Sequence, residues 1–216
     1  MKTIDGLSLQ EAILYMAIAT FVEKGFEKTS MDEVAARAGT TKRTVYAHFG
    51  NKEALFRAAL GRAVNRFQAD LPKLGDTADP ARELENFAAR FSELCTWLGA
   101  VRLQRVVMGE AERFPDLGGM MHSAVIGRAE TSVAAYLETL RATRRPDRAG
   151  DADWALIMAR LFLNMATGPQ RFESLLEARA LPPHHPNLGK GDPDLDRAHI
   201  RQAVALFLAG SGLETD

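Results

Sequence analysis

The stretch TSMDEVAARAGTTKRTVYAHFGNKEALF, residues 29–56, decides the fold of this 216-residue chain. Ser30 and Glu33 have the spacing of a capping box, in which a hydroxyl and a carboxylate satisfy free amides at the start of a helix. Gly39 is placed to end this first short helix, and Thr41 is placed to cap a second one. Two short helices joined through a glycine are typical of a helix-turn-helix.

The second helix of this motif opens with a cationic, hydroxyl-rich turn, Thr41-Lys42-Arg43-Thr44. In a helix-turn-helix, the first residues of the second helix meet base edges in the major groove. Arg and Lys can read guanine, and hydroxyls can bond bases or phosphates. The turn therefore predicts DNA contacts, whereas Val45 and Phe49 are expected to pack inside the protein.

Charge is distributed unevenly along the chain. Residues 1–66 contain 10 Lys and Arg against 7 Asp and Glu, although the formal net charge of the whole chain is −1. Within residues 34–66 one acidic residue, Glu53, accompanies seven basic ones: Arg37, Lys42, Arg43, Lys52, Arg57, Arg62 and Arg66. A basic N-terminal segment on an otherwise acidic chain indicates a polyanionic partner for that segment.

Composition excludes several classes of protein. With 46% hydrophobic and 25% charged residues, the chain is expected to fold as a globular protein. Its longest uncharged apolar run, residues 12–22, is far shorter than the ~20 residues that span a membrane. Asp5 and Glu11 precede this run, which argues against an export signal. The single cysteine, Cys95, agrees with a cytoplasmic protein, because it allows no intrachain disulfide.

Helical patterns extend over the rest of the chain and predict an all-α fold. Ser8 and Glu11 form another capping box, and this helix is expected to end before Gly25. Its buried stripe is Ile13, Ala17 and Phe21. Further helices are expected between Asn51, which caps the first of them, and Pro72, and at about 80–98, 100–113 and 117–143. Two more segments are expected to be helical: one that begins at Trp154, and a last one that carries Ile200, Val204, Phe207 and Leu208. Gly168-Pro169 is expected to interrupt or kink the first of these two segments, because proline lacks an amide proton. The proline-rich stretch 181–194 is expected to be a loop.

Residues 29–56 resemble the TetR/AcrR family of bacterial transcriptional regulators. They share its Ala-Gly turn, its Thr-x-Tyr-x-x-Phe pattern and the Lys-Glu that opens the next helix. The stretch RLQRVVMGEAERFP, residues 102–115, is similar to the central helix of an AcrR-like or AefR-like ligand domain. The resemblance implies a three-helix DNA-binding domain, residues 1–51, joined to a larger helical effector-binding and dimerisation domain, residues 52–216.

This resemblance also implies a function. The chain is expected to bind double-stranded DNA as a homodimer and to repress transcription until a small-molecule effector releases it from a palindromic operator. Compared with relatives, Ala47 replaces an occasional large aromatic residue and Arg43 a frequently small one. The positions that match the family's DNA contacts are Ser30, Thr41, Lys42, Arg43, Thr44, Tyr46, His48 and Lys52.

The effector pocket is expected among apolar and isolated polar residues of the larger domain. Methionine adapts to irregular pockets, and a buried polar group needs a partner. For any single one of these residues, packing in the core is the competing interpretation. The candidates are Phe91, Cys95, Gln104, Met108, His122, Met158, Phe162 and Met165.

Two apolar helices, the one that begins at Trp154 and the last one expected, predict the dimer interface. The pair from each chain can form a four-helix bundle about a two-fold axis. The last helix contributes Ile200, Val204, Phe207 and Leu208 to its apolar face. These faces can alternatively pack within one chain.

An enzyme is not expected. His184 and His185 lie near Asp192 and Asp194, but this spacing does not specify a zinc site. No Walker-type glycine loop is present, and Cys95 has no local basic residue to activate it. We therefore expect no catalytic residue, metal or cofactor. A helical adaptor that does not bind DNA remains the alternative function.

Overall fold

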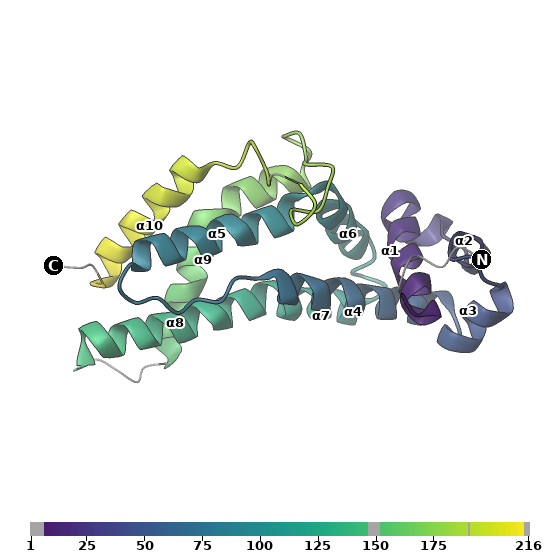
Figure 1. Ribbon diagram of the computed structural model, residues 1–216, viewed down its shortest axis with the longest axis horizontal. Helices are drawn as coiled ribbons and strands as arrows, with labels where there is room; N and C mark the ends of the chain where they lie inside the picture. Colours follow the sequence, from purple (N-terminus) through teal and green to yellow (C-terminus); the bar gives the residue numbers. More distant parts are fainter. Residues whose placement is uncertain (1–6, 147–151, 190, 214–216) are drawn as a thin grey trace. The chain divides into compact units, whose positions relative to one another are not determined.

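The computed structural model describes residues 7–146, 152–189 and 191–213, and all regular structure within these ranges is helical (Figure 1). This confirms the all-α fold class. In chain order the helices are α1 (Leu9–Lys28), α2 (Met31–Arg37), α3 (Lys42–Phe49), α4 (Lys52–Asp70), α5 (Pro80–Thr96), α6 (Leu98–Gly109), α7 (Pro115–His122), a π-helical turn (Ser123–Gly127), α8 (Arg128–Arg144), α9 (Ala152–Leu175) and α10 (Arg197–Ser211). In the described part of the chain, no helix is long and apolar enough to span a membrane.

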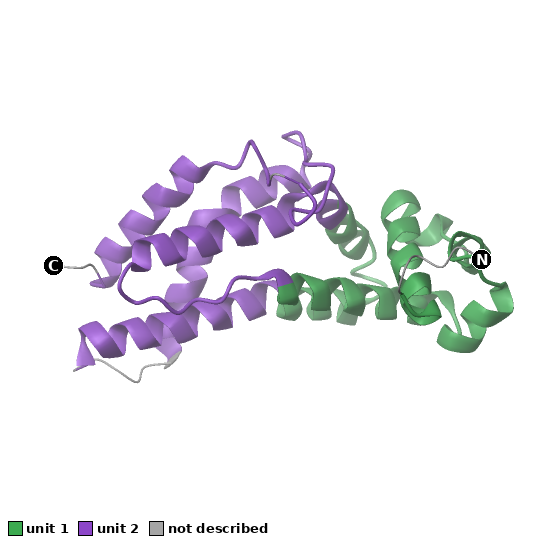
Figure 2. Ribbon diagram, viewed as in Figure 1, with its two compact units in different colours: residues 1–69, 102–124 green, residues 70–101, 125–216 purple. Residues whose placement is uncertain are grey.

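The chain divides into two compact units, coloured separately in Figure 2. The first contains residues 1–69 and 102–124, and the second contains residues 70–101 and 125–216. The chain therefore passes from one unit to the other near the end of α4, within α6 and within the π-helical turn.

The ends of the first helices follow the local sequence signals. Ser8 and Glu11 form the predicted reciprocal capping box. At Ser30, the hydroxyl accepts a bond from the Glu33 amide, but no return bond from Glu33 is present among the described residues. The prediction of a second complete capping box was therefore wrong, because the Glu33 carboxylate instead lies 2.6 Å from the Lys24 ammonium. Gly25 has φ +80° and breaks α1 as expected.

Aromatic packing holds the first unit together. The rings of Phe21 and Phe56 lie 4.7 Å apart, and Phe26 lies 5.4 Å from Phe56 and 5.1 Å from Phe114. Phe21, Phe26 and Phe56 are fully buried, as are the predicted stripe residues Ile13 and Ala17. This cluster fixes α1 against α4, and Val45 anchors α3 to the same unit by burying its side chain completely.

Helix α9 is the centre of the second unit, because it packs against α5, α8 and α10. Phe162 on α9 lies 5.1 Å from Phe207 on α10, and both rings are buried. Ile200, Val204 and Leu208 are also buried within the chain. The apolar face predicted for the last helix therefore packs inside the protein, as the competing interpretation held.

Pro169 does not interrupt α9, which runs unbroken from Ala152 to Leu175. Of the two expected outcomes, the interruption was therefore wrong, and the kink stays a prediction. Proline cannot donate to the carbonyl four residues earlier, that of Met165. In the structure the His199 ring nitrogen Nε2 lies 2.8 Å from this carbonyl and can donate to it. A side chain of α10 thus replaces the hydrogen bond that Pro169 cannot make.

Candidate nucleic-acid interface

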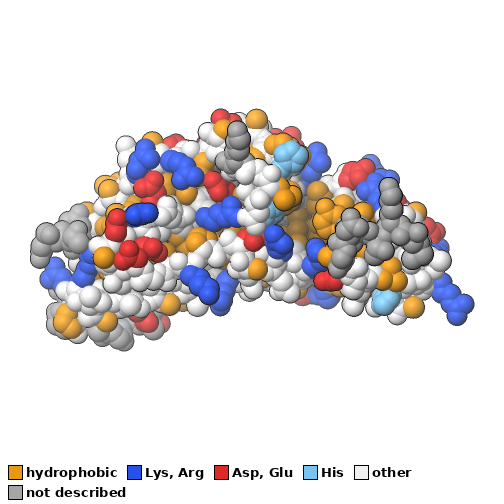
Figure 3. Space-filling model, in the orientation of Figure 1, with side chains coloured by type: hydrophobic (Ala, Val, Ile, Leu, Met, Phe, Trp, Pro, Cys, Tyr) orange, Lys and Arg blue, Asp and Glu red, His pale blue; other side chains and the backbone are white. Residues whose placement is uncertain are grey.

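Helix α3 presents a face formed by the residues that the sequence singled out. Successive residues are rotated by about 100° around a helix, so the surface opposite the buried Val45 is centred on Ala47 and Arg43. Lys42 with Tyr46 flanks this centre on one side, and Thr44 with His48 on the other. All of these residues are exposed except Thr44, which is half-buried. On the side drawn in Figure 3, basic and histidine side chains lie over α3.

The turn before α3 is built by the predicted capping residues. Gly39 has φ +66°, which glycine adopts at little cost. The Thr41 hydroxyl accepts a bond of 3.2 Å from the Thr44 amide and lies 2.9 Å from the Thr44 hydroxyl. The Ser30 hydroxyl caps α2 in the same way. A hydroxyl that accepts from an amide keeps its own proton, so Ser30 can cap a helix and still donate to a phosphate.

The seven basic residues of this region are not equivalent. Arg37 forms an ion pair with Glu23, and Arg57 forms one with Asp116. Their charges are compensated within the first unit, so the sequence count overstates the free positive charge. Arg43 is exposed and has no hydrogen bond or ion pair with any residue that the structure describes. It is therefore the α3 cation most available to a ligand.

Lys42 is paired, but weakly. Its ammonium lies 3.0 Å from the Asp32 carboxylate and 5.7 Å from the centroid of the Tyr46 ring. The hydrogen bond and charge of Asp32 raise the pKa of Lys42, which keeps the ammonium protonated. Solvent screens an exposed pair of this kind, which therefore contributes little to stability, so a phosphate can replace Asp32 at small cost.

Lys52 makes contacts that the sequence did not reveal. Its ammonium donates to the carbonyls of Phe26, at 3.0 Å, and Glu27, at 3.1 Å, and lies 4.5 Å from the Phe26 ring centroid. Carbonyls at a helix end lack helical partners, so Lys52 closes the end of α1. A phosphate contact by Lys52 stays a prediction.

The predicted effector residues are divided between the two units. Gln104, Met108 and His122 lie in the first unit, where Met108 and His122 are exposed. The others lie in the second unit: Phe91, Cys95 and Phe162 are buried, and Met158 and Met165 are half-buried. Burial raises the pKa of Cys95 to about 11, so this thiol stays protonated and unreactive in the core. Their role in effector binding stays a prediction.

Two surface cavities of the second unit are lined by other residues. One lies beside Arg141 and Trp154. The other lies between the end of α5 and the proline-rich loop, and its lining includes Trp97 and His184. Sequence reasoning placed the loop but missed this cavity, because the pairing of Trp97 with a segment about 90 residues later has no local signal.

Comparisons with known proteins agree with this geometry. Residues 13–59 match the model of the family described as bacterial regulatory proteins, tetR family. Residues 82–210 match the C-terminal domain of AefR-like transcriptional repressors.

Individual relatives extend the comparison. The HTH-type transcriptional repressor ComR of Escherichia coli K12 is 42% identical over 60 residues, which are 28% of this chain and 29% of ComR. The HTH-type transcriptional activator FasR of Mycolicibacterium smegmatis is 42% identical over 53 residues, 24% of each chain. These matches therefore span less than a third of the curated relatives. The solved structure of the flavonoid-responsive regulator FrrA has a TM-score of 0.73 and 26% identity, covering 94% of this chain and 96% of FrrA.

An N-terminal helix-turn-helix followed by a larger helical unit defines a regulator of the one-component class. In such a regulator, a single chain contains both the helix-turn-helix and the larger helical unit. The chain belongs to the TetR family of bacterial regulatory proteins, with a C-terminal domain of the AefR-like type. This family consists of transcriptional regulators rather than enzymes, which agrees with the non-enzymatic class expected from the sequence.

Proposed function

We propose that this chain is a cytoplasmic, sequence-specific DNA-binding repressor that acts as a homodimer and leaves a palindromic operator when a small-molecule effector binds. The observation that carries the proposal is the exposed centre of α3, where Arg43 is uncompensated and Ala47 leaves room for close approach. An α-helix fits the major groove, and arginine is the commonest reader of guanine there. We infer base contacts for Arg43 and Thr44. Phosphate contacts are inferred for Ser30, Thr41, Lys42, Tyr46, His48 and Lys52.

An apolar stripe on the second unit supports the homodimer. Ile157, Leu161 and Phe172 recur on one side of α9 at helical spacing, and Leu176 directly follows the last residue of α9. Each of the four is between 55% and 65% exposed. Leu206 on the neighbouring α10 is 68% exposed. Monomeric proteins rarely expose so many large apolar side chains together. A second copy related by a two-fold axis covers the same stripe on both chains. The dimer then carries two α3 helices, one for each half-site of the operator.

The proposal assigns different functions to two parts of the chain. Residues 1–51 read DNA, and residues 52–216 bind the effector and dimerise. The match of residues 82–210 to a repressor domain supports repression, although FasR shows that an activator can share the DNA-binding segment. FrrA, whose name describes a response to flavonoids, supports a small molecule as effector.

Salt dependence of DNA binding tests this function against the adaptor alternative. Neutralising phosphates releases counterions, so the logarithm of affinity falls linearly with the logarithm of salt concentration. We expect the purified full-length chain to bind labelled duplex DNA in fluorescence anisotropy with a steep negative slope. A helical adaptor would show no binding at any salt concentration, and that result would reject the proposal.

A further inference from the structure

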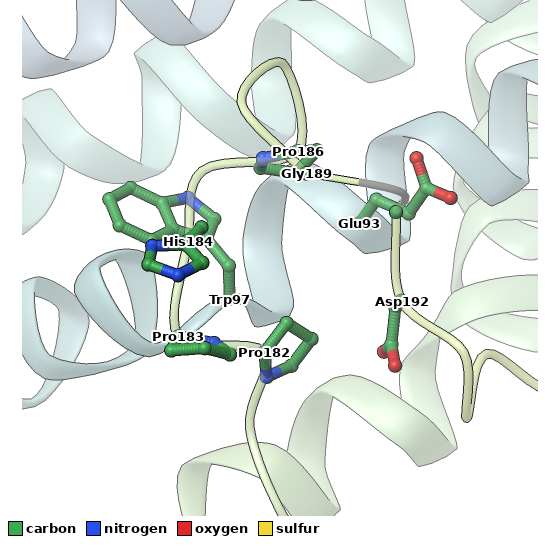
Figure 4. Close-up of a pocket in the computed structure, with 9 residues that line it drawn as sticks. Glu93, Trp97, Pro182, Pro183, His184, Pro186, Gly189 and Asp192 are labelled. Carbon is green, nitrogen blue, oxygen red and sulfur yellow. The ribbon is translucent and has the colours of Figure 1, made fainter.

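A small cavity in the second unit is walled by aromatic rings and prolines (Figure 4). Its volume is about 110 Å³. The rings of Trp97 and His184 lie beside each other on one side, and Glu93 and Asp192 border the opposite side. Pro182 contributes to the wall between them. The flat, largely apolar wall is suited to a ring rather than to an extended chain.

The carboxylates of the cavity are already compensated. Asp192 accepts two bonds from the Arg179 guanidinium, at 2.8 and 3.0 Å. Glu93 lies 3.3 Å from Arg197 and 3.4 Å from Arg90. A cationic ligand would have to compete with these arginines for the carboxylates, and an anionic ligand would have to compete with the carboxylates for the arginines. Charge thus favours an uncharged ligand.

Size restricts the ligand further. An apolar cavity of about 150 Å³ holds one benzene molecule. A cavity of about 110 Å³ that opens to solvent therefore accommodates a single ring, with its substituents toward the opening. Aromatic pairs contribute about 0.5–1.5 kcal/mol beyond burial of their area.

The position of the Trp97 ring is set by a glycine. A side chain at Gly99 would collide with the Trp97 ring, so the absence of a β-carbon lets the indole lie against the backbone of α6. The edge of the His185 ring meets the indole at 5.2 Å between centroids. The aromatic wall is thus held from both sides, by α6 and by the loop of residues 181–189.

The same loop is fastened to the ends of two helices that lead into the first unit. The amide of Leu98, the first residue of α6, donates to the carbonyl of Pro182 at 2.8 Å. The Asn187 side chain donates to the carboxylate of Asp70, the last residue of α4, at 2.8 Å. His185 lies 3.6 Å from the same carboxylate. Movement of this loop therefore acts directly on α4 and α6.

We propose that this cavity is the effector site and that it binds an uncharged molecule with a single aromatic ring. In this proposal, residues 181–189 transmit ligand binding to α4 through the hydrogen bond between Asn187 and Asp70. The proposal rests on the function proposed above and specifies its effector class and its transmission. A ring that enters between Trp97 and His184 displaces the loop, and the bond to Asp70 transfers that displacement to the helix preceding the second unit.

Intrinsic fluorescence tests the ligand site in the full chain. Trp154→Phe leaves Trp97 as the single tryptophan. We expect phenol, aniline and benzyl alcohol each to change its emission in a saturable manner, and benzoate and cyclohexanol to give no saturation. Gly99→Ala, which displaces the indole but suits a helix, and His184→Ala should each weaken binding roughly tenfold. Leu188→Ala is the matched control, because this side chain of the same loop is 84% exposed. No saturation with any neutral ring, or equal affinity in Gly99→Ala, would overturn the site.

Operator binding tests the transmission. The bound neutral ring should lower the operator affinity of the parent and of Leu188→Ala. Asn187→Ala should still bind the ring, but its operator affinity should change little when the ring is bound. Circular dichroism melts verify that each variant is folded. An equal effect in Asn187→Ala would overturn transmission through Asp70. Absence of DNA binding by the parent would instead reject the proposed function, while the fluorescence titration would still decide the ligand site.

Discussion

At the scale of the residue, Arg43 differs from the cations near it, because those cations are paired within the protein. Lys42 is held by Asp32, Arg37 by Glu23 and Arg57 by Asp116, whereas Arg43 has no such partner among the described residues. Desolvating an uncompensated guanidinium against a base edge breaks no bond within the protein. Electrostatics and position on α3 thus point to the same side chain.

Replacing Arg43 should therefore weaken binding and relax specificity. A bidentate contact between arginine and guanine discriminates against the wrong base by about 1–3 kcal/mol. We expect Arg43→Ala to lose about tenfold or more in operator affinity and to lose discrimination at one base pair per half-site, measured by anisotropy on a set of mutated operators. Arg57→Ala is the control, because Asp116 already occupies that guanidinium. Unchanged discrimination in Arg43→Ala would remove this residue from base reading.

Lys52 should affect folding as well as DNA binding. Its ammonium supplies hydrogen bonds to two carbonyls at the end of α1. We expect Lys52→Met, which keeps most of the apolar stem, to lower the free energy of unfolding by about 1–2 kcal/mol in urea titrations. If the urea midpoint stayed at its parent value while DNA affinity fell, the side chain would act only on phosphate.

At the scale of the element, the sequence predicted helix ends better than helix continuity. Ser8 and Thr41 cap helices as expected, and Asn51 caps α4 in the same way, because capping depends on residues three positions apart. The sequence left open whether Pro169 interrupts or kinks α9, because the continuity of this helix depends on His199, which follows Pro169 by 30 residues in the sequence and lies on another helix. Local signals therefore determine where helices begin, whereas tertiary contacts decide whether an unfavourable residue is tolerated.

The bond from His199 to Met165 can be measured by a double-mutant cycle. His199→Ala leaves the Met165 carbonyl without this donor and should cost about 1–2 kcal/mol of unfolding free energy. In a Pro169→Ala background, the new amide can donate to the same carbonyl, so His199→Ala should cost less. Chemical denaturation of the four proteins checks this coupling. Equal costs in both backgrounds would mean that His199 does not compensate for the proline.

At the scale of the whole molecule, the short reach of local sequence patterns likewise explains which sites the sequence could predict. The residues of α3 are consecutive, so one local pattern singled out the residues that form the exposed face of this helix. The aromatic cavity joins Trp97 to His184, and the compensation of Arg57 by Asp116 crosses 59 positions, so neither has a local pattern. A dimer surface on α9 and α10 stays a prediction, and the residues that α10 leaves exposed are not those of its predicted face.

A charge on the apolar stripe should separate the proposed dimer. Leu161 is 57% exposed at the middle of α9, and a carboxylate placed there would be buried against its counterpart. We expect Leu161→Glu to be monomeric in sedimentation experiments and to bind the operator much more weakly than the parent. Leu188→Glu adds the same charge on the loop and should remain a dimer. A dimeric Leu161→Glu would place the interface elsewhere.

Selection of bound sequences from random duplex DNA by the purified full-length protein tests the central claim most directly. If two α3 helices read DNA about a two-fold axis, the enriched sequences will contain an inverted repeat. Its half-site centres will be separated by about one helical turn, ~10 base pairs, or a multiple of it. Enrichment of no sequence above the input pool would contradict the claim that α3 of this chain reads DNA.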